Sequence, residues 1–221
     1  GGIARKSRLP SMIDRYSYRQ GRSVPNPELD AETALNTELG ARWSGENLRL
    51  KATVFHSRVD DLMQNVVIGE NPDVPGRLVS QTRNVGTADF TGLEVSASWT
   101  AGRLRFGLDY TFTELDPGET DGLVFVGVPD HEANLYLAFS PLRKLELIPS
   151  IHLASERLSS EFGDGDPVDG FAVGSLRALF NWSEALRLEL TIENVTDEHY
   201  RYDHGYPEPG RFFKFALRWR K

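Results

Sequence analysis

The sequence predicts an all-β protein, an antiparallel up-and-down transmembrane β-barrel of which about nine strands lie in this chain. Three observations lead to this prediction. Apolar side chains alternate with polar ones over long segments, short and long connections alternate along the chain, and the 4 tryptophans lie at strand ends or in a short turn. Together these features favour strands that cross a lipid bilayer over strands that pack in a soluble sandwich.

Composition limits the classes of protein to consider. The chain has 221 residues, with 25 basic and 32 acidic side chains and a formal net charge of -7. A nucleic-acid partner is not expected, because binding to phosphates requires a basic surface. No apolar run approaches the roughly 20 residues of a membrane-spanning helix. A transmembrane barrel remains compatible with this composition, since only its lipid-facing side is apolar.

The clearest strand is predicted around residues 103–113. Every second side chain there is apolar or aromatic, and the side chains between them are polar or glycine; the apolar series is Leu104, Phe106, Leu108, Tyr110 and Phe112. A spacing of two sends successive side chains to opposite faces of a strand, whereas a helix would need apolar residues three and four apart. The same period predicts strands at residues 35–43, 48–54, 93–99, 133–139, 145–153, 176–180, 186–192 and 213–219.

The connections between these strands alternate in length. Short turns are predicted at residues 44–47, 101–102, 141–144 and 181–184, and long loops at about residues 62–86, 114–127, 157–169 and 197–209. Strict alternation places all short turns at one end of the sheet and all long loops at the other.

The tryptophans separate the membrane barrel from its soluble alternative. Trp43, Trp99 and Trp219 end strands that run toward the short turns, and Trp182 lies in one of those turns. A soluble core would bury tryptophan near its middle, whereas a membrane barrel carries girdles of aromatic rings at its interfaces. We therefore expect these four residues to form a periplasmic aromatic girdle. The alternative is a soluble β-sandwich, for example a carbohydrate-binding module.

The C-terminal segment carries a recognisable pattern. It reads Ile192-Glu193-Asn194-Val195-Thr196-Asp197-Glu198-His199-Tyr200, followed by Pro209-Gly210-Arg211-Phe212-Phe213. Upstream lie Val24-Pro25-Asn26-Pro27-Glu28-Leu29, Asn84-Val85-Gly86 and Gly92-Leu93-Glu94. In this order the segments resemble motifs of TonB-dependent outer-membrane receptors, over about residues 8–221. One departure is the C-terminus, which is Trp219-Arg220-Lys221 where the family usually ends in an aromatic residue.

The resemblance implies a bacterial outer-membrane protein with a 22-stranded barrel around an N-terminal plug. Residues 1–221 would be the C-terminal portion of that barrel, with the plug absent. The implied function is uptake of an iron–siderophore complex or a similar scarce nutrient, with energy supplied by the TonB complex through the plug. Other implied partners are outer-membrane lipid and the barrel-assembly machinery, which would recognise the C-terminal strand through Phe213, Phe215, Leu217 and Trp219. A passive porin or structural barrel is the alternative.

No catalytic residue, metal ligand or cofactor is expected. The chain has no Gly-x-Ser-x-Gly nucleophile motif and no phosphate-binding loop. His199 and His204 fit no strict metal-ligand spacing, and Asp164-Gly165-Asp166 lacks the distal glutamate of an EF-hand. Loop aromatics are the candidate ligand contacts, although they also suit an outer aromatic belt: Tyr200, Tyr202, Tyr206 and Phe125.

Overall fold

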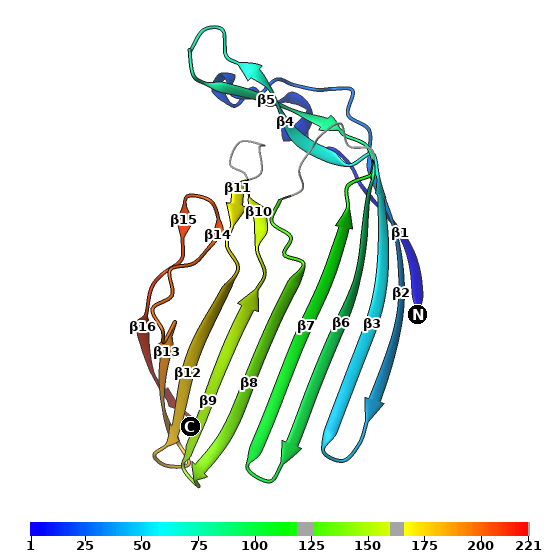
Figure 1. The fold of residues 1–221 in the computed structure, drawn as a ribbon. Coiled ribbons are helices and arrows are strands. Elements are labelled where there is room, and N and C mark those ends of the chain that lie inside the picture. The colour runs from blue at the N-terminus through cyan, green and yellow to red at the C-terminus, as the bar shows by residue number, and fades with distance from the viewer. Residues whose placement is uncertain (119–125, 160–165, 221) are drawn as a thin grey trace.

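The long strands form a single antiparallel sheet (Figure 1). The computed structural model describes residues 1–118, 126–159 and 166–220. In these residues the sheet has 10 strands in the order β1-β2-β3-β6-β7-β8-β9-β12-β13-β16. Their bounds are β1 Gly2–Arg8, β2 Glu32–Ser44, β3 Leu48–Asp60, β6 Ala88–Ala101, β7 Leu104–Asp116, β8 His131–Leu142, β9 Leu145–Ala154, β12 Phe171–Asn181, β13 Leu186–Glu193 and β16 Phe212–Trp219. The predicted all-β, up-and-down arrangement is confirmed.

Every strand predicted from the alternation is present, but the predicted number was one too low. The additional strand is β1, which pairs with β2 from Gly2 opposite Glu38 to Arg8 opposite Glu32. Its sequence gives no period-two signal, because Ile3 and Ala4 are adjacent and basic side chains follow. Backbone pairing with β2, rather than side-chain pattern, therefore places this strand in the sheet.

The sheet has one apolar face and one polar face. Residues that pair across adjacent strands share a face. One such row joins Leu39, Val54, Leu93 and Phe112. The row one position further along joins Thr53, Glu94, Thr111 and Glu132. We call the first side the outer face and the second the inner face.

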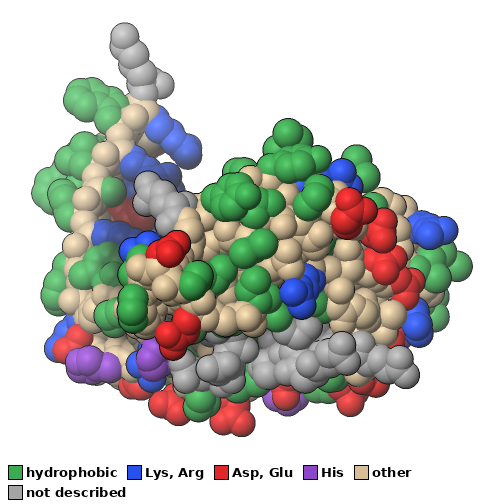
Figure 2. Space-filling view, turned by 90° about the horizontal axis from the view of Figure 1, so that it is seen from above, with side chains coloured by type: hydrophobic (Ala, Val, Ile, Leu, Met, Phe, Trp, Pro, Cys, Tyr) green, Lys and Arg blue, Asp and Glu red, His purple; other side chains and the backbone are tan. Residues whose placement is uncertain are grey.

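No other part of the chain that the structure describes covers the outer face. Leu39 is 67% exposed, Phe215 69% and Trp219 77%. In the space-filling view, the arm formed by the C-terminal strands carries hydrophobic side chains outside and Lys and Arg inside (Figure 2). A sandwich would bury such apolar rows against a second sheet. Because the long strands of the described residues form one sheet, the soluble sandwich alternative is wrong.

The outer apolar band ends abruptly toward the long loops. His56, the next outer-face residue after Val54 on β3, lies 3.3 Å from Asp89. Arg58 then lies 3.3 Å from Asp60 and 3.8 Å from Asp89. Charged side chains therefore replace apolar ones on the outer face near the loop end of the sheet.

The long connections contain short elements that the alternation did not predict. They are β4 Met63–Glu70 with β5 Leu78–Asn84, β10 Arg157–Ser159 with β11 Asp166–Val168, and β14 Arg201–Asp203 with β15 Tyr206–Pro207. The segment after β1 holds helix α1, Met12–Tyr16, and the 3-10 helix η1, Arg19–Gly21. In the described residues no helix is both long and apolar enough to cross a membrane.

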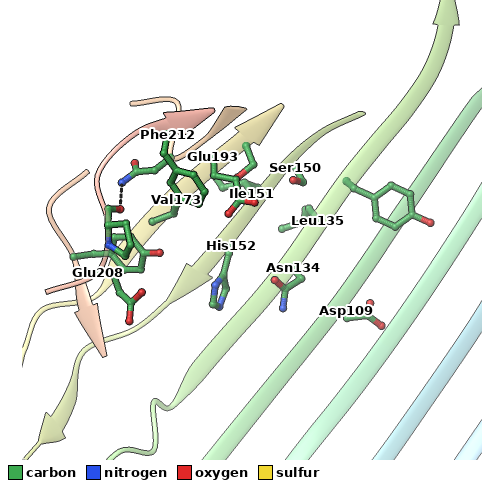
Figure 3. A pocket seen from close by; sticks show the side chains of 15 residues that line it. Asp109, Asn134, Leu135, Ser150, Ile151, His152, Val173, Glu193, Glu208 and Phe212 are labelled. Carbon is green, nitrogen blue, oxygen red and sulfur yellow. Dashed lines mark hydrogen bonds between the residues drawn. The ribbon is translucent and has the colours of Figure 1, made fainter. Parts of the chain in front are cut away.

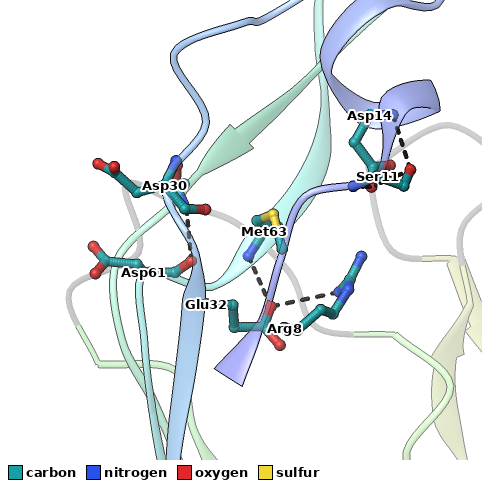
Figure 4. Close-up of polar contacts among 8 residues, drawn as sticks. Arg8, Ser11, Asp14, Asp30, Glu32, Asp61 and Met63 are labelled. Carbon is teal, nitrogen blue, oxygen red and sulfur yellow. Dashed lines mark hydrogen bonds and ion pairs between the residues drawn. The ribbon is translucent and has the colours of Figure 1, made fainter. Parts of the chain in front are cut away.

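The segment between β1 and β2 is attached to the β4–β5 hairpin. The Asn26 side-chain amide donates to Thr82 O at 2.9 Å, and Gln81 Nε2 donates to Pro25 O at 3.0 Å. At the base of the hairpin, Glu32 accepts from Met63 N at 3.0 Å and pairs with Arg8 at 3.5 Å (Figure 4). The Asn-Pro segment singled out in the sequence thus joins two chain segments that lie far apart in sequence.

Candidate ligand-binding site

A cavity of about 380 Å³ lies on the inner face near the loop end, where β7, β8, β9, β12 and β13 meet the β14–β15 segment (Figure 3). Its volume falls within the usual range of small-molecule sites. Most of its lining residues have polar side chains, and those with a carboxylate, imidazole or amide group are Asp109, Asn134, His152, Glu193, Asn194 and Glu208. We call this space the loop-side cavity.

Aromatic rings pack together beside the cavity. The ring centroid of Phe171 lies 4.7 Å from that of Tyr200 and 5.3 Å from that of Tyr202, and the two tyrosine rings are 5.9 Å apart. His152 joins them at 5.2 Å from Phe171 in an edge-on arrangement. Contacts at these distances stabilise a fixed geometry. Of the four rings, His152 and Tyr200 line the cavity.

Arg157 is buried behind these rings. Only 8% of this residue is exposed, and its guanidinium carbon lies 5.0 Å from the Tyr202 ring centroid and 5.4 Å from that of Phe171. Its Nε and Nη2 atoms have no hydrogen-bond partner among the described residues. The contact with the two rings is a cation–π arrangement that connects β10 with β12 and β14.

A short polar chain connects the rings to the inner face. His152 Nε2 lies 3.0 Å from Glu132 Oε1, and its Nδ1 lies 3.4 Å from the Tyr202 hydroxyl. Burial, followed by the charge of Glu208, raises the pKa of the Tyr202 phenol. Burial also raises the pKa of Tyr200, with smaller contributions from Tyr202, Glu208 and Glu193. Both phenols are therefore held in their neutral, hydrogen-bonding form.

The Asn194 and Asp197 turn anchors the segment that carries these tyrosines. Asn194 is 2% exposed at a φ of 52°, and its side chain accepts from Glu198 N and donates to Glu198 O and Pro209 O. Asp197 accepts from Arg211 N at 2.7 Å. The two halves of the C-terminal motif, separated in sequence, thus meet and set where the segment between β13 and β16 begins and ends.

The loop aromatics predicted as ligand contacts fall into three groups. Tyr200 lines the cavity and Tyr202 lies directly behind it. Tyr206, on β15, is 64% exposed and does not line it. Phe125 lies outside the described residues. Sequence reasoning missed His152, Arg157 and Phe171; the available signal was that His152 occupies a polar-face position of a predicted strand.

The candidate metal motifs find no support in the described residues. No group of three or more His, Cys, Asp or Glu side chains there could hold a metal ion. The backbone N–H of His204 donates to Ser159 Oγ, which connects β10 with the β14–β15 hairpin. Asp164 and Gly165 lie outside the described residues.

The predicted girdle residues gather at the short-turn end of the sheet. Trp43 and Trp219 lie near the ends of β2 and β16, Trp99 lies near the end of β6, and Trp182 follows β12. On β16 the candidate assembly residues share the outer face and are well exposed; they are Phe213, Phe215, Leu217 and Trp219.

Ion pairs connect neighbouring strands along the inner face. Glu189 lies 2.5 Å from Arg177 and 3.4 Å from Arg218, so it joins β12, β13 and β16. Arg105 pairs with Glu146, and Lys214 pairs with Glu193. These ion pairs join charges of both signs across the inner face.

Comparisons with known proteins agree with this architecture. The iron-regulated outer membrane virulence protein of Vibrio cholerae serotype O1 is 24% identical over 212 residues, covering 89% of this chain and 32% of the relative. The heme/hemopexin utilization protein C of Haemophilus influenzae is 27% identical over 224 residues, covering 88% of this chain and 31% of the relative. The chain thus spans about a third of the length of these relatives.

Solved structures share the fold. The copper transporter OprC superposes with a TM-score of 0.82 at 18% identity, covering 98% of this chain and 36% of that one. The ferric enterobactin receptor of Pseudomonas aeruginosa, in complex with enterobactin, superposes with a TM-score of 0.75 at 23% identity, covering 98% of this chain and 37% of that one. Residues 1–195 match the family model described as TonB dependent receptor-like, beta-barrel. This chain belongs to the TonB-dependent receptor β-barrel family.

Proposed function

We propose that this chain forms the C-terminal portion of the barrel of an outer-membrane receptor. The receptor takes up an iron–siderophore complex or a similar scarce nutrient, with energy coupled through TonB. The observation that carries this proposal is the combination of an uncovered apolar outer face with a polar cavity on the inner face. Family membership supports a transport role, since the family consists of receptors rather than enzymes.

The edges of the sheet support a larger barrel. β1 and β16 stand at the two ends of the strand order, so each has one edge without a partner strand among the described residues. Closure of a barrel removes such edges, which otherwise promote aggregation. In the proposed receptor, further strands pair with both edges, and a plug domain from outside this chain fills the lumen and engages TonB.

The outer face supports a defined position in the membrane. The four tryptophans would lie at the periplasmic headgroups, and the pairs around Asp89 would lie at the headgroups near the loops. During biogenesis the barrel-assembly machinery would recognise β16 through its aromatic outer side chains. The bilayer then covers the apolar rows that no protein layer covers.

The loop-side cavity is the proposed point of nutrient contact within this chain. Tyr200 and His152 form part of its wall, and Tyr202 contacts His152 and Arg157 from behind that wall. The names of two relatives and one solved neighbour refer to iron, heme or ferric enterobactin, which supports an iron-bearing nutrient. In this proposal the strands form the barrel wall, the long loops bind the nutrient, and the plug controls its passage through the lumen.

Uptake of radioactive iron by iron-starved cells tests the proposal. Cells that produce the whole receptor are supplied with a panel of ferric chelates, with heme as a separate sample. We expect accumulation from at least one of them, and we expect loss of TonB to abolish it. Tyr200→Ala should reduce that uptake, whereas Tyr18→Ala, at an exposed ring outside the cavity, should not. Uptake that is unchanged without TonB would favour the passive porin.

A further inference from the structure

We propose that the loop-side cavity recognises a cationic, ammonium-type group of the transported nutrient. This inference rests on the proposed function and adds the charge of the group that the receptor selects. Three features of the cavity carry it: the sign of its charges, the aromatic rings in its wall, and the partners that nearby cations already have.

The wall of the cavity is acidic. Asp109, Glu193 and Glu208 contribute carboxylates, and no Lys or Arg is among the lining residues. Glu193 is paired with Lys214, whereas Asp109 and Glu208 form no ion pair with any other described residue. In Figure 3 these three side chains and His152 surround the same space. A cleft lined by charges of one sign concentrates ligands of the other sign.

Aromatic rings complete a surface suited to an ammonium group. Tyr136 and Tyr200 line the cavity, and the faces of such rings attract cations. The third lining ring, Phe212, already has the Lys214 ammonium 4.8 Å from its centroid. Side-chain oxygens of Asn134, Ser150 and Ser175 add hydrogen-bond acceptors for a donor-rich group.

Two cations near the cavity have partners of their own. Lys214 is held between Glu193 and the Phe212 ring. Arg157 is buried behind Phe171 and Tyr202 and does not line the cavity. The basic side chain among the lining residues is His152, whose two ring nitrogens face Glu132 and Tyr202. None of these three groups forms an ion pair with Asp109 or Glu208.

The acidic character is local to the loop end. Nearer the short turns, Arg42 and Lys51 pair directly across β2 and β3, and Arg49 lies opposite Ser98 of β6. These basic residues share the inner face with the cavity. A position beside them is therefore a matched control with the opposite local charge.

Thiol labelling measures this selectivity without knowledge of the nutrient. The chain has 0 cysteines, so Ser150→Cys introduces a single thiol in the cavity and Ser98→Cys introduces one beside Arg49. Each variant of the whole receptor, in isolated outer membranes, is treated with trimethylammonium-ethyl or sulfonato-ethyl methanethiosulfonate. Rates are divided by those of a free thiol, and the unsubstituted receptor supplies the background.

We expect Ser150→Cys to react about tenfold faster with the cationic reagent than with the anionic one, because the carboxylates concentrate cations. Ser98→Cys should show the reverse preference. Adding Asp109→Asn and Glu208→Gln should remove the preference at Ser150→Cys and should not weaken the anionic preference at Ser98→Cys, since Asp109 lies diagonally across from Ser98. Tetramethylammonium should slow labelling of Ser150→Cys by the uncharged methyl reagent, and sodium at the same concentration should not.

Three results would overturn the proposal: a preference for the anionic reagent at Ser150→Cys, a cationic preference that survives the double neutralisation, or no labelling there while Ser98→Cys reacts. Labelling requires neither transport nor TonB. Failure of iron uptake with the charge preference intact would therefore count against the proposed function alone.

Discussion

The ring of Tyr136 on β8 lies directly against Gly107 on β7. The two residues are direct cross-strand partners on the inner face. A Cβ atom at Gly107 would lie 2.1 Å from Cε1 and 2.5 Å from Cζ of that ring. The glycine therefore leaves the space that the tyrosine fills, and this contact fixes one wall of the loop-side cavity. The same arrangement recurs where the Phe55 ring covers Gly92.

Gly107→Ala should displace the Tyr136 ring and destabilise the barrel by about 1–3 kcal/mol, the usual cost of inserting a methyl group into an occupied space. Gly174→Ala is the control, because a Cβ atom there meets only Ser150 O at 3.9 Å. The midpoint of heat-induced unfolding in detergent, followed by gel mobility, measures the difference. Equal midpoints for the two variants would show that the ring does not depend on the glycine.

The two faces of β7 predict opposite responses to a change of polarity. Leu108→Arg places a charge on the outer face and should cost about 2–4 kcal/mol near the bilayer midplane. Arg105→Leu, on the inner face, should be milder, because it removes only the exposed pair with Glu146. Unfolding of the membrane-inserted receptor in urea measures both. A larger loss for Arg105→Leu would invert the assignment of the faces.

Arg157→Met should loosen the contact between the β10–β11 and β14–β15 hairpins. It retains an unbranched side chain but removes the cation from the faces of Phe171 and Tyr202, a contribution of about 0.5–2 kcal/mol. Faster amide hydrogen exchange at residues 201–207 is the expected readout. Arg103→Met, in the short turn before β7, serves as the matched control. Unchanged exchange in both variants would argue that Arg157 does not stabilise the contact between the two hairpins.

Asn194→Gly separates backbone conformation from hydrogen bonding at the C-terminal motif. Glycine accepts the positive φ of this position but loses the contacts to Glu198 and Pro209. We expect a loss of about 1–3 kcal/mol, because buried polar backbone groups lose their partners. Val195→Gly, at a neighbouring and more exposed position, should cost less. Equal stability of Asn194→Gly and the parent would mean that backbone conformation alone accounts for the asparagine.

Tyr200 and Tyr202 should lose their phenolic protons late in an alkaline titration, that is, at a higher pH than an ordinary tyrosine. Their pKa values are raised above the ordinary 10.0, so the stability that their neutral forms contribute is complete below that pH and is lost as the pH rises through the folded-state values. Tyrosinate absorbance recorded during an alkaline titration gives the measurement. Tyr200→Phe and Tyr202→Phe should each remove a late component of that absorbance change. A late component that persists in both cluster variants would contradict the assignment.

The period of two determined the long strands, the direction of their side chains and the end of the sheet where the tryptophans gather. These features could be predicted because alternation is a local property of the chain: a residue's face follows from its position within its own strand. β1 escaped prediction for the same reason, since Gly2–Arg8 has no alternation and joins the sheet through backbone pairing with β2.

Which residues meet at the cavity was decided by the tertiary structure. His152 and Tyr202 are 50 positions apart, and Arg157 reaches the Tyr202 ring from a different loop. No local pattern encodes such contacts, because they depend on the register between strands and on how loops of unequal length fold back over the sheet. Alternation could assign Gly107 and Tyr136 to the polar face, but only the pairing of β7 with β8 places one ring over one glycine.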